Sequence, residues 1–252
     1  MKSIYRLAII MAAAMALLML SVPLQASQMD DRIVSTARNS YMFKNFLQND
    51  DIKIKSIDGA VTLTGIVAGN FNKSLAAETV AGIPNVKRVD NRLEIKGAPP
   101  TANSDAWLRD KVKATLMFHR SVSAGTTEVD VKDGIVTLRG NAGSEAQKAL
   151  TAEYARDVEG VKSVNNEMIV TKGSKNTKTI GETIDDASII AQVKITLLSH
   201  RSTSAINTKV EAKRGVVTLY GKASDSAEKN LATKLANDIN GVKGVNNRMT
   251  VE

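Results

Sequence analysis

Two histidines are the residues of this sequence best suited to chemistry, and they lie in matching tripeptides. His119-Arg120-Ser121 and His200-Arg201-Ser202 each follow an apolar stretch with helical spacing. Histidine can act as a base or bind a metal, but a metal shared between them would need two more ligands that the sequence does not offer. His and Arg also suit the free carbonyls at the C-terminal end of a helix. We therefore expect helix capping and no metal or other cofactor.

The remaining polar residues do not assemble into a nucleophile–base–acid set. The sequence has no cysteine, which excludes disulfides, thiolate metal sites and a cysteine nucleophile. Carboxylates are plentiful, but they alternate with other residues as they do on solvated surfaces. We expect a protein that is not an enzyme.

Three seven-residue stretches each begin and end with glycine: Gly59–Gly65, Gly134–Gly140 and Gly215–Gly221. Apolar and polar residues alternate between the glycines, which predicts a half-buried strand. The first glycines, Gly59, Gly134 and Gly215, suit a hairpin turn with positive φ. The second glycines are expected to end the strand: Gly65, Gly140 and Gly221. We interpret all six as structural turn glycines rather than as a phosphate cradle.

Three asparagines recur in the last predicted strand of each repeat: Asn91, Asn166 and Asn247. Each shares its strand parity with apolar residues that should face the core. A buried amide must find partners, so we expect bonds to nearby backbone. Contact with a ligand is the alternative.

The end of the first predicted helix is apolar and is flanked by lysine or arginine. The residues concerned are Met42, Phe43, Phe46 and Leu47 in the first repeat and Met117 and Phe118 in the second. Such a surface suits lipid headgroups or a client protein. Packing between the repeats is the alternative.

Positive charge is concentrated in the third repeat. It has a net charge of +5 over Asp186–Val251, against −1 for Asp105–Val170. The candidate contacts for an anionic surface are Lys209, Lys213, Arg214, Lys222 and Lys229, each worth on the order of 1 kcal/mol near an anionic bilayer. A solvated face is the alternative, and the lack of interleaved aromatic residues argues against nucleic acid.

These residues must be positioned by a unit that occurs three times. The sequence pattern of each unit predicts a helix, two strands joined by a hairpin, a second helix and a final strand. The second unit lies 75 positions after the first, and the third lies 81 after the second. The fold class is therefore α+β, with three tandem αββαβ domains at 31–96, 105–170 and 186–252. In each, a small three-stranded sheet should pack against two helices.

The segments between the units predict linkers and an exported chain. Residues 97–104 hold adjacent prolines and predict a stiff linker, whereas residues 171–185 are polar and predict a flexible one. Residues 1–26 show the charged, apolar and polar parts of a secretory signal, with cleavage expected near Ala26. The apolar run is shorter than the roughly 20 residues of a spanning helix, which favours a signal over a membrane span. No later stretch of the sequence could cross a membrane, so we expect no transmembrane span after removal of the signal. Retention of the segment as an anchor is the alternative.

The pattern Gly-x-Val-Thr-Leu-x-Gly, a helix, and then Gly-Val-x-x-Val-x-Asn resembles the BON domain family. The second and third units match in full, whereas the first has Pro84-Asn85-Val86 in place of the second Gly-Val motif. The resemblance implies an αββαβ fold in the bacterial envelope. Family members are associated with phospholipid binding, outer-membrane integrity and chaperone-like handling of envelope proteins.

We therefore expect a periplasmic protein that binds an anionic phospholipid surface or unfolded envelope proteins without catalysis. The alternative is a structural scaffold that docks on a larger envelope assembly. The sequence leaves the oligomeric state and the packing of the three repeats open.

Overall fold

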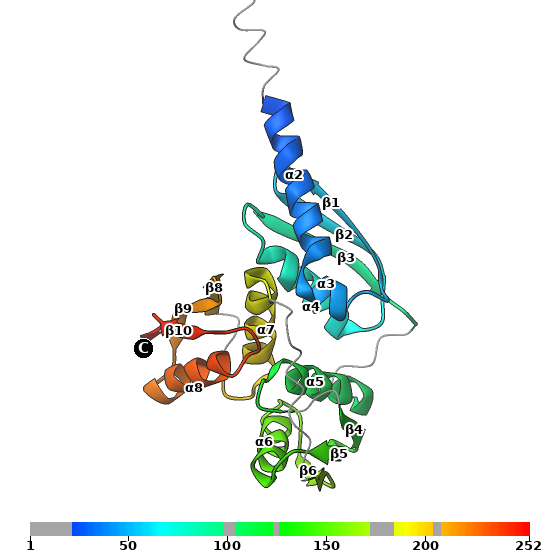
Figure 1. The fold of residues 1–252 in the computed structure, drawn as a ribbon, viewed down its shortest axis with the longest axis vertical. Coiled ribbons are helices and arrows are strands. Elements are labelled where there is room, and N and C mark those ends of the chain that lie inside the picture. Colours follow the sequence, from blue (N-terminus) through cyan, green and yellow to red (C-terminus); the bar gives the residue numbers. More distant parts are fainter. Residues whose placement is uncertain (1–21, 98–103, 123–125, 172–183, 204–207) are drawn as a thin grey trace, which may run out of the picture.

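A computed structural model of the chain describes residues 22–97, 104–122, 126–171, 184–203 and 208–252. Most of the expected signal segment and most of both linkers lie outside the described residues. Within them, the chain forms three αββαβ domains (Figure 1). The α+β fold class predicted from the sequence is confirmed.

The second domain shows the plan of the unit. It consists of α5 (Asp105–Phe118), β4 (Thr127–Lys132), β5 (Ile135–Ala142), α6 (Glu145–Arg156), β6 (Ser163–Asn166) and β7 (Ile169–Val170). The central strand β5 pairs antiparallel with β4 and parallel with β6 and β7. Alternate residues of β5, such as Val136 and Leu138, are buried, so one face of the sheet meets the helices and the other meets solvent.

The other two domains repeat this plan. The first contains α2 (Val22–Asn39), α3 (Tyr41–Asn45), β1 (Asp51–Ile57), β2 (Ala60–Val67), α4 (Asn70–Ala81) and β3 (Arg88–Ile95). The third contains α7 (Asp186–Ser199), β8 (Thr208–Lys213), β9 (Val216–Ala223), α8 (Ser226–Asn237), β10 (Gly244–Asn247) and β11 (Thr250–Val251). In both domains the two hairpin strands pair antiparallel. The final strand segments, β3 in the first domain and β10 and β11 in the third, pair parallel with the central strand, which is β2 or β9.

The first predicted helix of the first domain forms two helices in the structure. α2 starts at Val22, and it ends at Asn39 because Ser40 adopts an extended conformation. The Ser40 hydroxyl accepts a hydrogen bond from the Phe43 amide and so caps the short helix α3. The expected cleavage point, Ala26, lies within α2. No helix in the described part of the chain is both long and apolar enough to cross a membrane.

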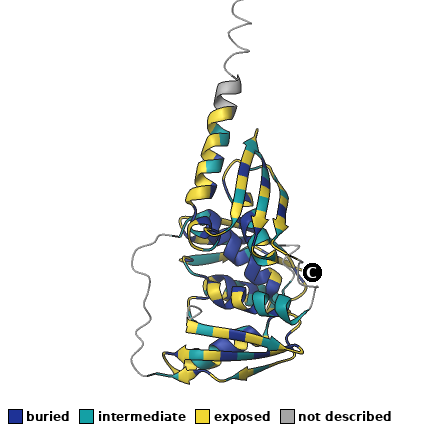
Figure 2. Cartoon of the chain, turned by 90° about the vertical axis from the view of Figure 1, so that its right-hand side faces the viewer, coloured by how far each residue is buried: buried dark blue, intermediate teal, exposed yellow. Residues whose placement is uncertain are grey.

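Helix α7 lies at the centre of the molecule and contacts all three domains. It packs against α4 of the first domain, α5 of the second, and β8 and α8 of its own domain. Eleven of its fourteen residues are buried, which Figure 2 shows as dark blue in the middle of the molecule. A helix that is apolar on every side needs cover on every side. Because α7 has that cover, the first and third domains share one continuous core, while the second keeps a core of its own.

Candidate functional site

An aspartate at the start of each domain holds the hairpin turn, and the sequence interpretation missed it. Carboxylate oxygens of Asp105 accept hydrogen bonds from the amides of Asp133 (2.7 Å) and Gly134 (2.9 Å). Asp30 and Asp186 make the same contacts in the other domains. These amide bonds hold the pKa of the Asp105 carboxyl below its usual value. The signal was available, since an aspartate precedes each turn glycine by 29 positions.

The glycines are needed by the backbone in two different ways. Gly134 follows Asp133, and φ is positive at both residues (80° and 54°), as in a type I′ hairpin turn. The second glycine does not end the strand as expected, because β5 continues past Gly140 to Ala142. A Cβ atom at Gly140 would lie 1.9 Å from the carbonyl oxygen of Thr126 on the neighbouring segment. Only glycine fits that approach, so this position serves the scaffold.

The recurring asparagines tie the last strand to the second helix. The Asn166 side-chain amide donates to the Lys148 carbonyl (2.7 Å), and its oxygen accepts from the Met168 amide (3.2 Å). Asn91 and Asn247 make the equivalent pairs of bonds. Both ends of each amide are used within the domain, which is the backbone bonding expected for a buried amide.

Five of the six apolar helix-end residues are covered by the packing of the domains. Met42, Phe43 and Leu47 are buried in the core shared by the first and third domains, and Phe46 packs against that core. Phe118 is completely buried. Four of these side chains are buried and Phe46 is half-buried, so packing of the domains leaves them little open surface.

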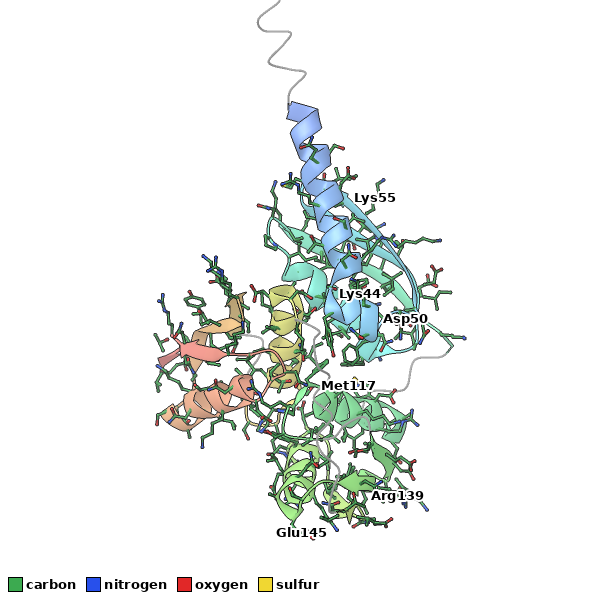
Figure 3. The ribbon with its side chains drawn as sticks, viewed as in Figure 1. Lys44, Asp50, Lys55, Met117, Arg139 and Glu145 are labelled. Carbon is green, nitrogen blue, oxygen red and sulfur yellow. The ribbon has the colours of Figure 1, made fainter. Side chains whose placement is uncertain are left out.

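Phe118 crosses from the second domain into the first. Its ring centroid lies 6.0 Å from that of Phe46 and 5.7 Å from that of Phe71. The remaining helix-end residue, Met117, which Figure 3 labels, is 37% exposed. The candidate interface expected from the sequence therefore keeps open surface chiefly at Met117 and Phe46.

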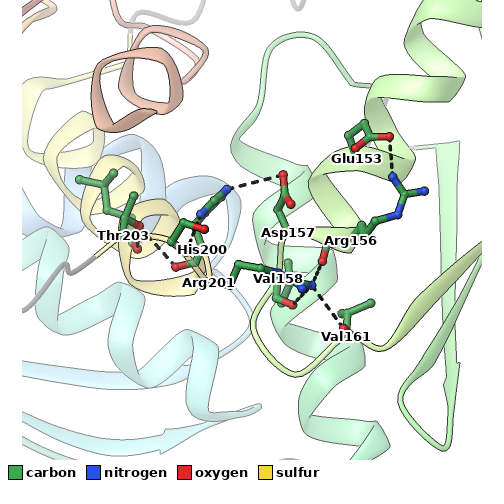
Figure 4. A network of polar contacts seen from close by, with 10 residues as sticks. Glu153, Arg156, Asp157, Val158, Val161, His200, Arg201 and Thr203 are labelled. Atoms are coloured by element: carbon green, nitrogen blue, oxygen red, sulfur yellow. Dashed lines mark hydrogen bonds and ion pairs between the residues drawn. The ribbon is translucent and has the colours of Figure 1, made fainter. Parts of the chain in front are cut away.

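The two His-Arg tripeptides join the second and third domains reciprocally. Arg201 of the third domain donates its amide to the Asp157 carbonyl (3.0 Å), and its guanidinium reaches the carbonyls of Val158 and Val161 (Figure 4). His200 Nε2 lies 3.6 Å from an Asp157 carboxylate oxygen. Burial lowers the pKa of His200, although the Asp157 charge opposes this shift. The helix end of one domain thus binds the carbonyls that end a helix of the other.

The reverse contact is tighter and is more deeply buried. Arg120 donates to the carbonyls of Asp238, Ile239 and Val242, and His119 Nδ1 lies 3.0 Å from Asp238 Oδ2. The Tyr154 hydroxyl donates to the same carboxylate at 2.5 Å, and its ring stacks on that of His119 at 3.7 Å. Burial and Asp238 together raise the pKa of Tyr154. This arrangement joins the second and third domains through a buried polar network.

The basic residues of the third repeat divide between two layers. Lys209 and Lys213 are exposed on β8, Lys222 is exposed on β9, and Arg214 lies in the turn between these strands. These four border the sheet face that is not covered by helices. Lys229 lies on α8, in the helical layer on the other side of the sheet. We name the solvent face of β8 to β11, with its turn, the basic sheet face.

Ion pairs on the basic sheet face leave part of its charge free. Lys209 lies 2.7 Å from Glu211, and Lys222 lies 3.4 Å from Glu252. Lys213, Arg214 and the exposed Arg248 have no ion-pair partner among the residues that the structure describes. Because the paired residues are also exposed, their mutual attraction is weak and is screened by salt.

The same face of the second domain has the opposite charge at matching positions. Three acidic residues of the second domain are replaced by basic ones in the third: Glu128 by Lys209, Asp133 by Arg214 and Glu167 by Arg248. The backbone pairing is the same in both domains. The two domains therefore share their strand pairing and differ in the charge of exposed side chains. Such a difference can give one repeat a ligand that the other does not bind.

A groove at the junction of the three domains was not anticipated from the sequence. Its walls come from α4, α5 and α7, and they include Trp107, the only tryptophan of the chain. A comparison of the repeats could have drawn attention to this place, because Trp107 occupies the position that Ser188 has in the third repeat.

Comparison with known proteins places these features in a family. The BON domain matches residues 30–97, 104–172 and 185–252. The osmotically-inducible protein Y of Escherichia coli strain K12 is 31% identical over 199 residues, which are 78% of this chain and 95% of that protein. An uncharacterized protein of the gshII 5′ region in Anaplasma centrale is 30% identical over 141 residues, 56% of this chain and 90% of that protein.

More distant similarity reaches an outer-membrane protein and a secretion-system protein. The outer membrane lipoprotein DolP of Haemophilus influenzae is 31% identical over 111 residues, 43% of this chain and 57% of that protein. The structural protein CdsD of the Chlamydia trachomatis type III secretion system is 17% identical over 88% of this chain and 92% of that one. Its TM-score of 0.24 is too low to bear on the fold. The three matched segments and the repeated αββαβ architecture show that this chain belongs to the BON domain family.

Proposed function

We propose that the protein binds the surface of anionic phospholipid membranes in the bacterial envelope, without catalysis, through the basic sheet face of its third domain. The observation that carries this proposal is the replacement of acids by bases at three matching positions: Glu128/Lys209, Asp133/Arg214 and Glu167/Arg248. A scaffold alone would not require this difference between domains with the same fold.

The physical basis is the attraction of exposed lysine and arginine to a negative bilayer. Each such residue near the surface contributes about 1 kcal/mol, so three unpaired cations and two partly neutralised ones suffice for reversible binding at low salt. Tyr220, whose ring lies 5.7 Å from Lys209 Nζ, adds an aromatic side chain to the same face. Aromatic rings with a polar tip favour the headgroup level of a bilayer.

The relatives support an envelope location. One is named an outer membrane lipoprotein, and the family resemblance together with the signal-like residues 1–26 favours the periplasm for this chain. Because five of the six apolar helix-end residues named above pack in or against the core, the protein would associate with a membrane surface rather than insert into it.

The test is sedimentation of the protein with vesicles of phosphatidylglycerol and phosphatidylcholine at low salt, with pure phosphatidylcholine vesicles as the comparison. We expect sedimentation with the anionic vesicles alone, and we expect it to weaken steeply as salt rises. The triple variant Lys209→Glu, Arg214→Glu, Arg248→Glu should stay in the supernatant. Sedimentation of this variant with the anionic vesicles to the same extent as the unchanged protein would contradict the proposal.

The scaffold alternative is separated by the same experiment. A surface built only for another protein has no reason to bind vesicles that contain no protein. Absence of sedimentation, together with one dominant partner after crosslinking in intact cells, would favour the scaffold.

A further inference from the structure

The groove at the junction of the three domains, which we name the junction groove, has a volume of about 340 Å³. Its apolar walls are formed by Phe71 of the first domain, Trp107 and Ala114 of the second, and Ile195 and Leu198 of the third. A concave apolar site at a domain junction, with a few polar groups at its edge, is the usual setting for a ligand. Leu198 is 55% exposed, so an apolar wall of the groove remains open to solvent.

The corresponding surface of the third domain already holds a polypeptide. There, Ser188 stands in the place of Trp107, and its hydroxyl accepts a hydrogen bond from the Met42 amide at 3.2 Å. The Asp185 carboxylate accepts from the Tyr41 amide at 2.8 Å. This face of the first helix in the αββαβ unit is therefore a protein-docking face in one domain, and in the second domain part of it lies open as the groove.

The polar edge of the junction groove favours N–H donors over a phosphate. Asp110 and Glu159 contribute carboxylates to it, and Lys111 is the only basic residue among the described residues that line it. The Lys111 ammonium is already engaged, 3.2 Å from Glu159 and 4.7 Å from the centre of the Trp107 ring. Arg109 engages Oδ1 of Asp110 and Lys111 engages Oε2 of Glu159, so each carboxylate keeps its second oxygen as an acceptor. An anionic headgroup would find the one cation occupied and two carboxylates nearby, whereas a peptide amide, lysine or arginine would find these remaining acceptors.

We propose that the junction groove binds an exposed polypeptide segment that presents an apolar side chain next to a lysine or arginine. The apolar side chain enters between Trp107 and Leu198, and the basic neighbour meets Glu159 and Asp110 at the edge. This binding goes beyond the membrane proposal, because it uses the junction of the three helices rather than the basic sheet face. The two sites carry opposite charge preferences, so they select different ligands.

Trp107 allows the groove to be monitored directly in the full chain. The probe is an acetylated, amidated peptide of twelve residues that repeats Phe-Ser-Lys and contains no tryptophan. Its entry removes water from the indole, and we expect a saturable blue shift of tryptophan emission. A peptide that repeats Phe-Ser-Glu is the matched control, and we expect it to bind at least about tenfold more weakly.

Two variants test whether the shift comes from the groove. Leu198→Asp places a charge on the open apolar wall, and we expect an affinity at least about tenfold lower for the Phe-Ser-Lys peptide. Ile169→Asp is the matched control, because Ile169 is also exposed, at 65%, but lies on β7 and does not line the groove. Glu159→Lys reverses a charge that is mostly exposed, so the fold is retained, and it should shift the preference towards the Phe-Ser-Glu peptide.

The proposal is overturned if neither peptide changes the emission, if Leu198→Asp binds as the unchanged protein does, or if Glu159→Lys leaves the preference unaltered. A saturable shift with phosphatidylglycerol vesicles but with neither peptide would assign the groove to lipid instead. The basic-face triple variant should still bind the Phe-Ser-Lys peptide. Failure of the vesicle experiment therefore leaves this result standing, and failure of the peptide experiment leaves the membrane proposal standing.

Discussion

Asp238 gathers more polar contacts across the junction of the second and third domains than its repeat equivalent Asp157. Its carboxylate accepts hydrogen bonds from His119, Ser121 and Tyr154, while the Asp157 carboxylate faces His200 at 3.6 Å. The Asp238 side chain is 16% exposed and that of Asp157 is 43% exposed. The two halves of the interface therefore contribute unequally to stability.

We expect Asp238→Ala to lower the free energy of unfolding by about 2–3 kcal/mol, because it leaves buried donors without their charged acceptor. Asp157→Ala is the matched control, and it should cost at most about 1 kcal/mol because that pair is partly solvated. Urea denaturation of both variants measures the difference. Equal losses would contradict the asymmetry of the interface.

Asp238 also predicts a dependence of stability on pH. Burial raises the pKa of its carboxyl, but the hydrogen bonds from His119, Ser121 and Tyr154 outweigh burial and lower it below 3.8 in the folded state. A depressed folded pKa adds stability that is complete above the unfolded value and is lost as the pH falls through the folded value. The urea midpoint of unfolding should therefore decrease between pH 7 and pH 3 by a smaller amount in Asp238→Asn than in the unchanged protein. An equal decrease in both proteins would show that Asp238 does not contribute to the pH dependence of stability.

Sequence patterns predicted single residues well where a domain is self-contained. The bonds of Asn91, Asn166 and Asn247 follow from the need to satisfy a buried amide locally. His119 and Arg120 were expected to cap their own helix. In the structure, Arg120 binds carbonyls of the third domain and His119 binds the Asp238 carboxylate of that domain. A sequence cannot separate the two cases, since repeats supply several chemically similar helix ends.

At the scale of elements, the second glycine of each stretch sets the spacing of the two hairpin strands. β4 and β5 pair from Thr127 with Gly140 to Lys132 with Ile135. A side chain at Gly140 would collide with the backbone of Thr126, so it would push the edge strand away from β5. The glycine thus sets how closely the two strands can approach.

We expect Gly140→Ala to destabilise the protein by about 3 kcal/mol or more, since both the contact and the positive φ of 114° oppose a Cβ atom. Gly244→Ala is the matched control. Gly244 also lies in a strand and has no positive φ, and a Cβ atom there would meet no atom of the surrounding structure within 4 Å. Thermal unfolding followed by circular dichroism should show a large drop in Tm for the first variant and a change of a few degrees at most for the second. Similar Tm values would show that the strand can shift without cost.

The helices were predicted less completely than the hairpins. The extension of α2 to Val22 lies in the polar, proline-containing end of the segment that resembles a secretory signal, which the sequence interpretation assigned to the signal rather than to the first domain. The burial of α7 could have been predicted from the sequence, because Ala187–Leu198 is apolar on almost every side of the helix. Such a helix needs neighbours all around it, but the sequence does not say which repeats supply them.

At the scale of the whole molecule, Phe118 links the second domain to the shared core of the other two. We expect Phe118→Ala to cost about 3–5 kcal/mol, because it empties a site surrounded by aromatic rings. The loss should also separate unfolding of the second domain from that of the others, giving two calorimetric transitions. Met117→Ala, next to it but 37% exposed, should leave the transition nearly unchanged. A single unaltered transition in Phe118→Ala would mean that the domains are coupled by other contacts.

The arrangement of the three domains explains why their surfaces matter more than their motifs. The repeated Gly-x-Val-Thr-Leu-x-Gly stretch made the architecture predictable, because three copies at fixed spacing exclude most other folds. The same repetition hid the functional differences, since these lie at non-recurring positions such as Trp107 and Arg248. Comparing the repeats with one another in the folded structure locates the basic sheet face and the junction groove.

The most direct test of membrane binding through the basic sheet face is a reciprocal exchange of charge between the second and third domains. One protein carries Lys209→Glu, Arg214→Asp and Arg248→Glu, and the other carries Glu128→Lys, Asp133→Arg and Glu167→Arg. Sedimentation with phosphatidylglycerol vesicles at fixed low salt compares both with the unchanged chain. We predict that the first exchange abolishes binding and that the second strengthens it. Binding that is unchanged by the first exchange would contradict the account.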